Sequence, residues 1–222
     1  FEAALKFNPE GIEMDVVLYK GRLYCYHPHV KKTAFNVQND ELIEKQLAEL
    51  EAHGELAAIE FQTLAVPLLD QVNFLLLDLK QKGREVLEPL VKYIENLALP
   101  KTKLILGARD LGRLEELQPY SHLFQILSLS QNPDNFEQFI SLGAFAIRLW
   151  EADVTAERAL AIHQLGAKVF VTPGHPPTET QARTAGEISG KLLRELEKMQ
   201  VDAVLVNDIE MARETISISP EK

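Results

Sequence analysis

Short runs of apolar residues alternate along the chain with segments in which apolar residues recur at helical spacing. The apolar runs predict seven strands, at 11–19, 72–80, 102–109, 124–130, 144–150, 168–173 and 202–208. Most of these runs are hydrophobic without interruption, which is typical of parallel strands covered on both faces. The pattern therefore predicts an α/β protein with a largely parallel sheet.

Amphipathic helices with recognisable ends separate the predicted strands. Residues 39–54 begin with Asn39 or Asp40 as a cap, repeat leucine and isoleucine at helical spacing, and stop at Gly54. Three further segments follow the same pattern, at 84–97, 155–166 and 190–200. No glycine-rich phosphate loop follows any predicted strand, so the alternation favours a TIM (β/α)8 barrel over a nucleotide-binding open sheet. Because this barrel has eight strands, we expect its first strand to be missing or to lie upstream of Phe1.

Composition limits the functions open to such a fold. The chain has 222 residues and is 46% hydrophobic, which predicts one globular domain over residues 1–222. Its net charge of -10, without a block of Lys or Arg, argues against a nucleic-acid partner. One cysteine, Cys25, excludes an internal disulfide, and no apolar run approaches the roughly 20 residues of a membrane helix. We expect a soluble protein, with a cytoplasmic location favoured and the oligomeric state left open.

Charged residues interrupt the first two predicted strands at regular spacing. Glu13 and Asp15 share one face of the first strand, and Asp78 and Lys80 share one face at the end of the second. The active site of a barrel lies at the C-terminal ends of its strands, where the three carboxylates would converge. Oxygen ligands in that number suit Mg²⁺ or Ca²⁺ better than zinc. His27 would then act as a general acid or base beside the metal.

Each of these residues also has a simpler interpretation. Glu13 and Asp15 by themselves fit the solvated face of an edge strand. Asp78 and Lys80 by themselves fit an ion pair at a strand end. His27 by itself fits a hairpin residue whose ring has a satisfied hydrogen bond. From the residues alone, these alternatives stay open.

Three stretches resemble the glycerophosphodiester phosphodiesterase family in the same order along the chain. FEAALKFNPEGIEMDVVLYKGRLYCYHPH, residues 1–29, is similar to the family segment in which a Glu-x-Asp pair is followed, after a glycine turn, by a histidine on the next strand. FQTLAVPLLDQVNFLLLDLK, residues 61–80, resembles the family's threonine-leucine helix opening and its acidic-x-Lys strand. QLGAKVFVTPG at 164–174 and MQVDAVLVND at 199–208 resemble its last two strands.

This resemblance implies a metal-dependent phosphodiesterase that hydrolyses glycerophosphodiesters, or a related lipid-derived phosphodiester, to an alcohol and a phosphomonoester. The implied ligands of the divalent cation, Mg²⁺ or Ca²⁺, are Glu13, Asp15 and Asp78. It further implies that His27 is one of two catalytic histidines and that Lys80 helps to hold the phosphate. The alternatives are a sphingomyelinase D-like lyase that forms a cyclic phosphate, and a non-catalytic barrel that binds phosphate esters.

The chain departs from the family pattern at several points. The family's first catalytic histidine belongs to a His-Arg-Gly motif that does not occur in this sequence, and by spacing it would fall before Phe1. Pro28 follows the histidine where the family usually has Asp, and Asp78 stands where it usually has Glu. The family's Trp-Thr at the seventh strand is replaced by VTP at 171–173.

Four residues near other predicted strand ends are further candidates for substrate binding. His175 lies in the loop after the strand at 168–173, where it would contact the substrate or replace part of the missing histidine's role. Arg109 and Arg148 suit phosphate geometrically, or would serve as buried partners of an acid such as Glu151. Trp150 fits packing at the rim, or a cation–π contact with a cationic headgroup.

Overall fold

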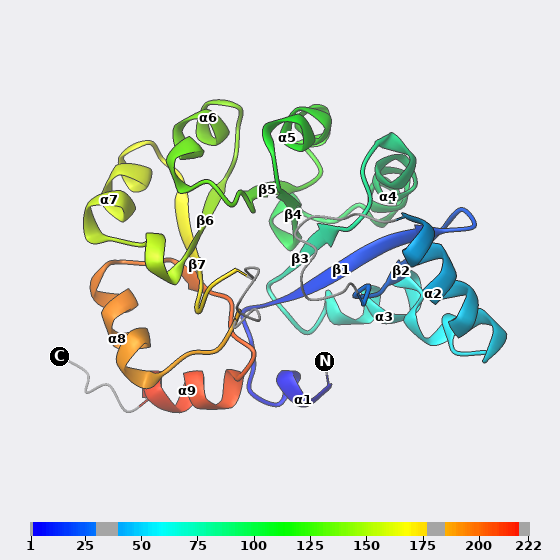
Figure 1. Ribbon diagram of the computed structural model, residues 1–222, viewed down its shortest axis with the longest axis horizontal. Coiled ribbons are helices and arrows are strands. Elements are labelled where there is room, and N and C mark those ends of the chain that lie inside the picture. The colour runs from blue at the N-terminus through cyan, green and yellow to red at the C-terminus, as the bar shows by residue number, and fades with distance from the viewer. Residues whose placement is uncertain (1, 30–39, 177–184, 218–222) are drawn as a thin grey trace. The chain divides into compact units, whose positions relative to one another are not determined.

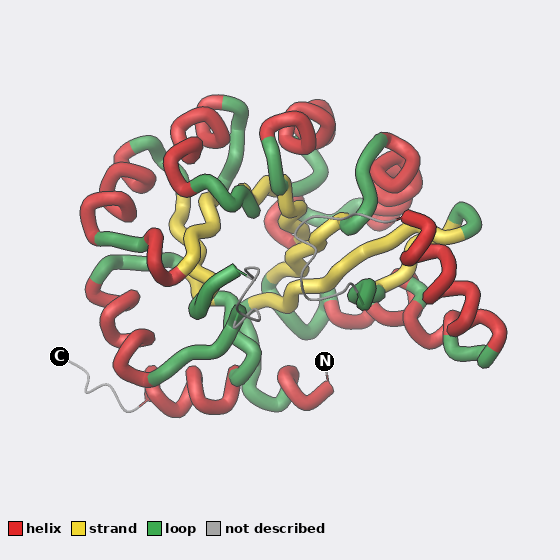
Figure 2. Tube along the Cα trace, viewed as in Figure 1, coloured by secondary structure: helices red, strands yellow, loops and turns green. Residues whose placement is uncertain are grey.

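The computed structural model describes residues 2–29, 40–176 and 185–217. Strands and helices alternate along this part of the chain (Figures 1 and 2). The strands are β1 (Gly11–Tyr19), β2 (Arg22–Cys25), β3 (Phe74–Leu79), β4 (Leu104–Ala108), β5 (Gln125–Ser128), β6 (Ala146–Trp150), β7 (Lys168–Thr172) and β8 (Ala203–Val204). The α-helices are α1 (Glu2–Leu5), α2 (Asp40–Ala52), α3 (Phe61–Leu64), α4 (Arg84–Leu97), α5 (Leu111–Leu117), α6 (Phe136–Ser141), α7 (Ala156–Gln164), α8 (Gly190–Lys198) and α9 (Ile209–Ser217).

The chain divides into two compact units. The N-terminal unit consists of Glu10–Ala108 and Gly112–Ile126, and the C-terminal unit consists of Phe1–Pro9, Arg109–Leu111 and Leu127–Lys222. The expectation that residues 1–222 form one domain stays a prediction.

Strand β1 organises the sheet of the N-terminal unit. It turns back at Lys20 and Gly21 into the antiparallel hairpin strand β2, and its other edge pairs in parallel with β3, which pairs in turn with β4. Lys20 and Gly21 both have positive φ, as a tight two-residue hairpin turn requires. β3 and β4 are buried over almost their whole length, which explains why their sequences are hydrophobic without alternation.

The C-terminal unit repeats the parallel strand–helix pattern. The end of β5 pairs with β6, β6 with β7, and β7 with β8, all in parallel. Helices α7 and α8 begin at Thr155 and Ser189, whose side chains accept hydrogen bonds from the main-chain N–H groups of Arg158 and Leu192. The two helices confirm the predictions from apolar spacing at 155–166 and 190–200. None of the described helices is long and apolar enough to cross a membrane.

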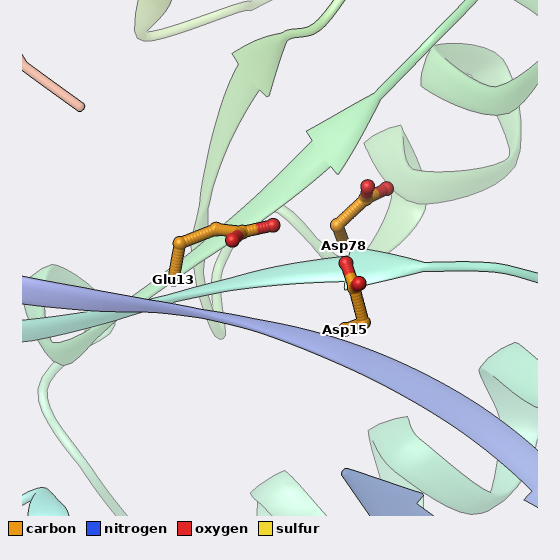
Figure 3. A group of neighbouring side chains, drawn as sticks. All are labelled: Glu13, Asp15 and Asp78. Atoms are coloured by element: carbon orange, nitrogen blue, oxygen red, sulfur yellow. The ribbon is translucent and has the colours of Figure 1, made fainter. Parts of the chain in front are cut away.

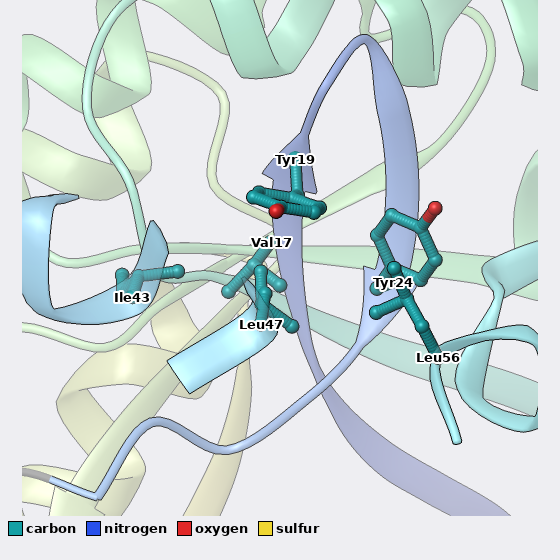
Figure 4. Packing of buried hydrophobic residues seen from close by; sticks show 6 residues of the cluster. All are labelled: Val17, Tyr19, Tyr24, Ile43, Leu47 and Leu56. Carbon is teal, nitrogen blue, oxygen red and sulfur yellow. The ribbon is translucent and has the colours of Figure 1, made fainter. Parts of the chain in front are cut away.

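A hydrophobic cluster fixes helix α2 against the β1–β2 hairpin. Its buried members come from both strands, from α2 and from the 3-10 helix that follows it (Figure 4): Val17, Tyr19, Tyr24, Ile43, Leu47 and Leu56. From Val17 onward, the face of β1 that carries Glu13 and Asp15 is covered by apolar side chains. The charged pair therefore lies on the part of the strand that this cluster leaves uncovered.

Truncating the cluster should weaken the whole N-terminal unit. Leu47 on α2 is fully buried, so Leu47→Ala should lower the free energy of unfolding by about 2–5 kcal/mol in a urea titration. Leu160→Ala is the matched control. Leu160 on α7 is 55% exposed, so this substitution should lower the free energy of unfolding far less. Equal losses in the two variants would contradict the packing described here.

Candidate functional site

The register between β1 and β3 brings three carboxyl groups together. Asp15 lies opposite Asp78 in the parallel pair, and Glu13 lies opposite Leu76. Residues two apart on a strand share a face, so all three acidic side chains project from the same side of the two strands (Figure 3). Each offers one carboxylate oxygen within 4.8 Å of the other two.

Two cationic or basic side chains contact this carboxylate cluster. The Lys80 ammonium, one residue beyond the end of β3, lies 2.5 Å from Asp15 Oδ1 and 2.6 Å from Asp78 Oδ2. His27 approaches from the segment after β2, and its Nδ1 contacts Asp15 Oδ2. A carboxylate only accepts hydrogen bonds, so Nδ1 carries the proton and Nε2 stays available to another group. The structure thus gathers five of the residues proposed from sequence.

Two of the three carboxylates in the cluster are buried, whereas Glu13 is exposed. β1 lies between β2 and β3, and the Asp15 and Asp78 side chains are only 8% and 4% exposed. The interpretation as the solvated face of an edge strand is therefore wrong for Asp15, whereas Glu13 is exposed to solvent. The ion pair considered for Asp78 and Lys80 does form, and it includes Asp15 as well.

Desolvation, and then neighbouring negative charge, change the acidity of Glu13. Desolvation by the surrounding protein atoms, and then repulsion from the Asp15 and Asp78 carboxylates, raise the pKa of Glu13 to about 8. The positive charge of Lys80 lowers this pKa. Water still reaches the Glu13 side chain, which weakens the effect of burial on its pKa without reversing the direction. Glu13 therefore holds its proton to a higher pH than an ordinary glutamate does.

Cys25 lies beside the cluster but does not join it. Burial, and then the charge of Asp15, raise the pKa of the Cys25 thiol to about 12. A thiol with that pKa stays protonated at neutral pH and does not act as a thiolate ligand. The potential metal ligands of this site are therefore oxygens.

The cluster has the properties of a site for one divalent cation. Asp15 Oδ1 is buried, and the Lys80 ammonium lies 2.5 Å from it as a counter-ion. Two oxygens on one ion lie at most twice the metal–oxygen distance apart, about 4.2 Å for Mg²⁺ and about 5 Å for Ca²⁺. Three oxygens within 4.8 Å of one another meet the limit for Ca²⁺, and carboxylates suit both ions.

The remaining sequence candidates belong to the C-terminal unit. Trp150 is buried, its Nε1 donates to Gln131 Oε1 at 2.8 Å, and the Arg148 guanidinium lies 4.5 Å from its ring centroid. Arg148 is also buried and donates to the Leu129 carbonyl at 2.9 Å. His175 is half-buried, with Nδ1 2.7 Å from the Pro176 carbonyl oxygen. Substrate contacts by these residues, and by the half-buried Arg109, stay predictions.

Sequence reasoning missed one polar residue at the edge of the cluster. Gln81 directly follows Lys80, and its carboxamide binds the main chain of Leu18, which lies 63 positions away in the sequence. Apart from its place next to Lys80, no pattern in the sequence distinguishes Gln81 from other surface glutamines.

Comparison with known proteins identifies the fold. Neither a scan against protein-family models nor a search of curated proteins found a match. Among solved structures, the chain is similar to a candidate glycerophosphodiester phosphodiesterase from Galdieria sulphuraria, with 17% identity, coverage of 98% of this chain and 89% of that one, and a TM-score of 0.73. It is also similar to a glycerophosphodiester phosphodiesterase from Parabacteroides distasonis, with 17% identity, coverage of 98% and 86%, and a TM-score of 0.68.

A third similar structure carries a bound product. It is an Oleispira antarctica phosphodiesterase in complex with sn-glycerol-3-phosphate, with 15% identity, coverage of 97% of this chain and 88% of that one, and a TM-score of 0.66. These likenesses confirm the predicted α/β fold of the TIM-barrel type.

The raised pKa of Glu13 predicts how the stability of the cation-free protein depends on pH. A folded state that keeps this proton up to about pH 8, while the unfolded state releases it near 4.5, loses stability as pH rises between those values. Glu13→Gln cannot ionise, so in urea titrations with a chelator its free energy of unfolding should rise relative to wild type between pH 5.5 and pH 8.5. If the free energies of unfolding of the two proteins changed with pH in parallel, the prediction of a raised pKa for Glu13 would be contradicted.

Proposed function

We propose that this chain is a metal-dependent phosphodiesterase that hydrolyses glycerophosphodiesters, or a related lipid-derived phosphodiester, to an alcohol and a phosphomonoester. One observation carries the proposal: Glu13, Asp15, Asp78, Lys80 and His27 meet at one site in the N-terminal unit. The chain also shares its fold with phosphodiesterases, one of which holds sn-glycerol-3-phosphate. That ligand supports a small-molecule substrate containing a glycerol phosphate.

The three carboxylates are the proposed ligands of a divalent cation, Mg²⁺ or Ca²⁺. When bound, such an ion polarises a phosphoryl oxygen and offsets negative charge that develops during cleavage. Glu13 has to lose its proton to serve as a ligand, so cation affinity should increase as pH rises toward 8. Asp15 and Asp78 are buried and share the single positive charge of Lys80, so negative charge remains for a metal ion to offset.

Lys80 and His27 are the proposed groups that act on the phosphodiester. The Lys80 ammonium is held beside Asp15 and Asp78, where it would bind a non-bridging oxygen as a localised positive charge. His27 is oriented by Asp15 through Nδ1, which leaves Nε2 to move a proton on the attacking or leaving oxygen. Its side chain is 62% exposed, so a substrate can reach this nitrogen without rearrangement of the strands.

The other expectations for this protein stay predictions. They concern a substrate role for Arg109, Trp150 and His175, a cytoplasmic location, and the absence of a nucleic-acid partner. A sphingomyelinase D-like lyase would use the same cation site but release a cyclic phosphate. A non-catalytic barrel would bind the cation and a phosphate ester without turnover.

Phosphorus NMR of a reaction with glycerophosphocholine separates these functions. With Mg²⁺ or Ca²⁺ present, we expect a phosphomonoester signal, whereas a cyclic phosphate would indicate the lyase and an unchanged diester the binding barrel. His27→Ala should lower the rate by roughly 10²–10⁴-fold and keep cation binding, because it removes the proton-transfer group and one contact to Asp15 but none of the three carboxylates. Asp15→Asn should lose both cation binding and turnover.

His53→Ala is the matched histidine control. His53 follows helix α2, and its ring contacts the Glu49 carbonyl oxygen rather than the carboxylate cluster. It should turn over the diester at the wild-type rate. Wild-type turnover by His27→Ala, or wild-type cation binding by Asp15→Asn, would refute the assigned roles.

A further inference from the structure

A glutamine side chain braces the two strands that carry the carboxylate cluster. The Leu18 N–H on β1 donates to Gln81 Oε1 at 2.5 Å, and Gln81 Nε2 donates back to the Leu18 carbonyl at 3.1 Å. One carboxamide thus satisfies both main-chain groups of a strand residue, as a neighbouring strand would otherwise do.

The brace begins where the ladder between the two strands ends. The last pair in register is Val16 with Leu79, and the Lys80 N–H donates to the Val16 carbonyl at 3.0 Å. Beyond that point β3 has ended, while β1 continues to Tyr19. Gln81 therefore extends the connection between the two chain segments past Lys80.

The position of the brace in sequence ties it to the ligands. Leu18 lies three residues after Asp15, and Gln81 lies three residues after Asp78, the residue opposite Asp15. A change in how closely these two segments lie would alter the separation of the two carboxylates and move Lys80. Metal sites tolerate little such movement, because ligand distances must hold to within about 0.2 Å.

Arg113 fixes the main chain of Gln81. Arg113 is a buried residue of α5, and its guanidinium donates to the main-chain carbonyl of Gln81 and to that of Gly83 at 3.5 Å. The same guanidinium pairs with Glu116 at 2.8 Å. The main chain of Gln81 is fixed by Arg113, while its side chain fixes Leu18.

We propose that Gln81, supported by Arg113, is a positioning residue of the carboxylate site. Its role is to keep β1 and β3 at the separation that lets Asp15 and Asp78 bind one cation together, and to keep Lys80 beside them. The inference rests on the proposed cation-dependent function. Gln81 acts through the two strands rather than as a metal ligand.

Gln46 offers a matched control for the loss of the brace. Its carboxamide makes the same pair of bonds to one main-chain residue: the His29 N–H donates to Oε1 at 3.0 Å, and Nε2 donates to the His29 carbonyl at 2.9 Å. Gln46 belongs to α2, and its two hydrogen bonds to His29 do not join β1 to β3. Removing either glutamine deletes an equivalent pair of main-chain contacts, and removing Gln46 also deletes the hydrogen bond that the Tyr26 hydroxyl donates to it at 3.1 Å.

The test is calorimetric titration of the full chain with Mn²⁺, a hard divalent cation. Gln81→Leu should weaken Mn²⁺ binding about 10-fold or more, as is typical when a residue that orients metal ligands is lost. Gln46→Leu should stay within about twofold of wild type, although urea titration in a chelator should show comparable losses of stability for both. This comparison separates positioning from general destabilisation.

Gln81→Asn is the second variant in case Gln81→Leu does not fold. It keeps a carboxamide but is one methylene too short to reach Leu18 from the same backbone, so its Mn²⁺ affinity should fall as well. The inference would be overturned if the folded Gln81 variants bound Mn²⁺ with wild-type affinity, or if Gln46→Leu lost as much Mn²⁺ affinity as they do. Either result would leave the proposed function intact. If wild-type protein itself binds no Mn²⁺, the cation-dependent function fails and the inference fails with it.

Discussion

The register of one pair of parallel strands determines the candidate site. Asp15 on β1 and Asp78 on β3 lie directly opposite each other, and their carboxylates meet the same Lys80 ammonium. A slip of one residue would turn one of these side chains to the other face of the sheet. The apolar residues that alternate with them, among them Met14 and Leu77, are buried and oppose such a slip. Packing of the sheet therefore fixes the geometry of the charged groups.

This arrangement costs stability in the absence of a compensating cation. Three carboxyl groups share a small space with one ammonium, and Glu13 responds by keeping its proton to an unusually high pH. Groups with strongly shifted pKa values often gather at functional sites, where local stability is lost in exchange for chemistry. The hydrophobic cluster beneath α2 and the glutamine brace at Leu18 hold the strands together despite this repulsion.

Local patterns in the sequence were sufficient to predict most of the elements and the shared face of Glu13 and Asp15. Largely apolar runs without polar alternation indicated β3, β4, β6 and β7, because these strands are buried on both faces. The apolar spacing of 84–97 indicated the full extent of α4. What could not be predicted depends on contacts between distant segments. Gln81 meets Leu18 across 63 positions, and nothing in either residue's neighbourhood specifies the other.

The central claim is that Glu13, Asp15 and Asp78 hold one divalent cation between them. Anomalous diffraction from a crystal grown with Mn²⁺ tests this claim most directly, because the signal locates the ion without assumptions about activity. The account predicts one strong peak at about 2.0–2.6 Å from an oxygen of each of the three carboxylates. Density at saturating Mn²⁺ that shows no peak there, with the Lys80 ammonium still between Asp15 and Asp78, would contradict it.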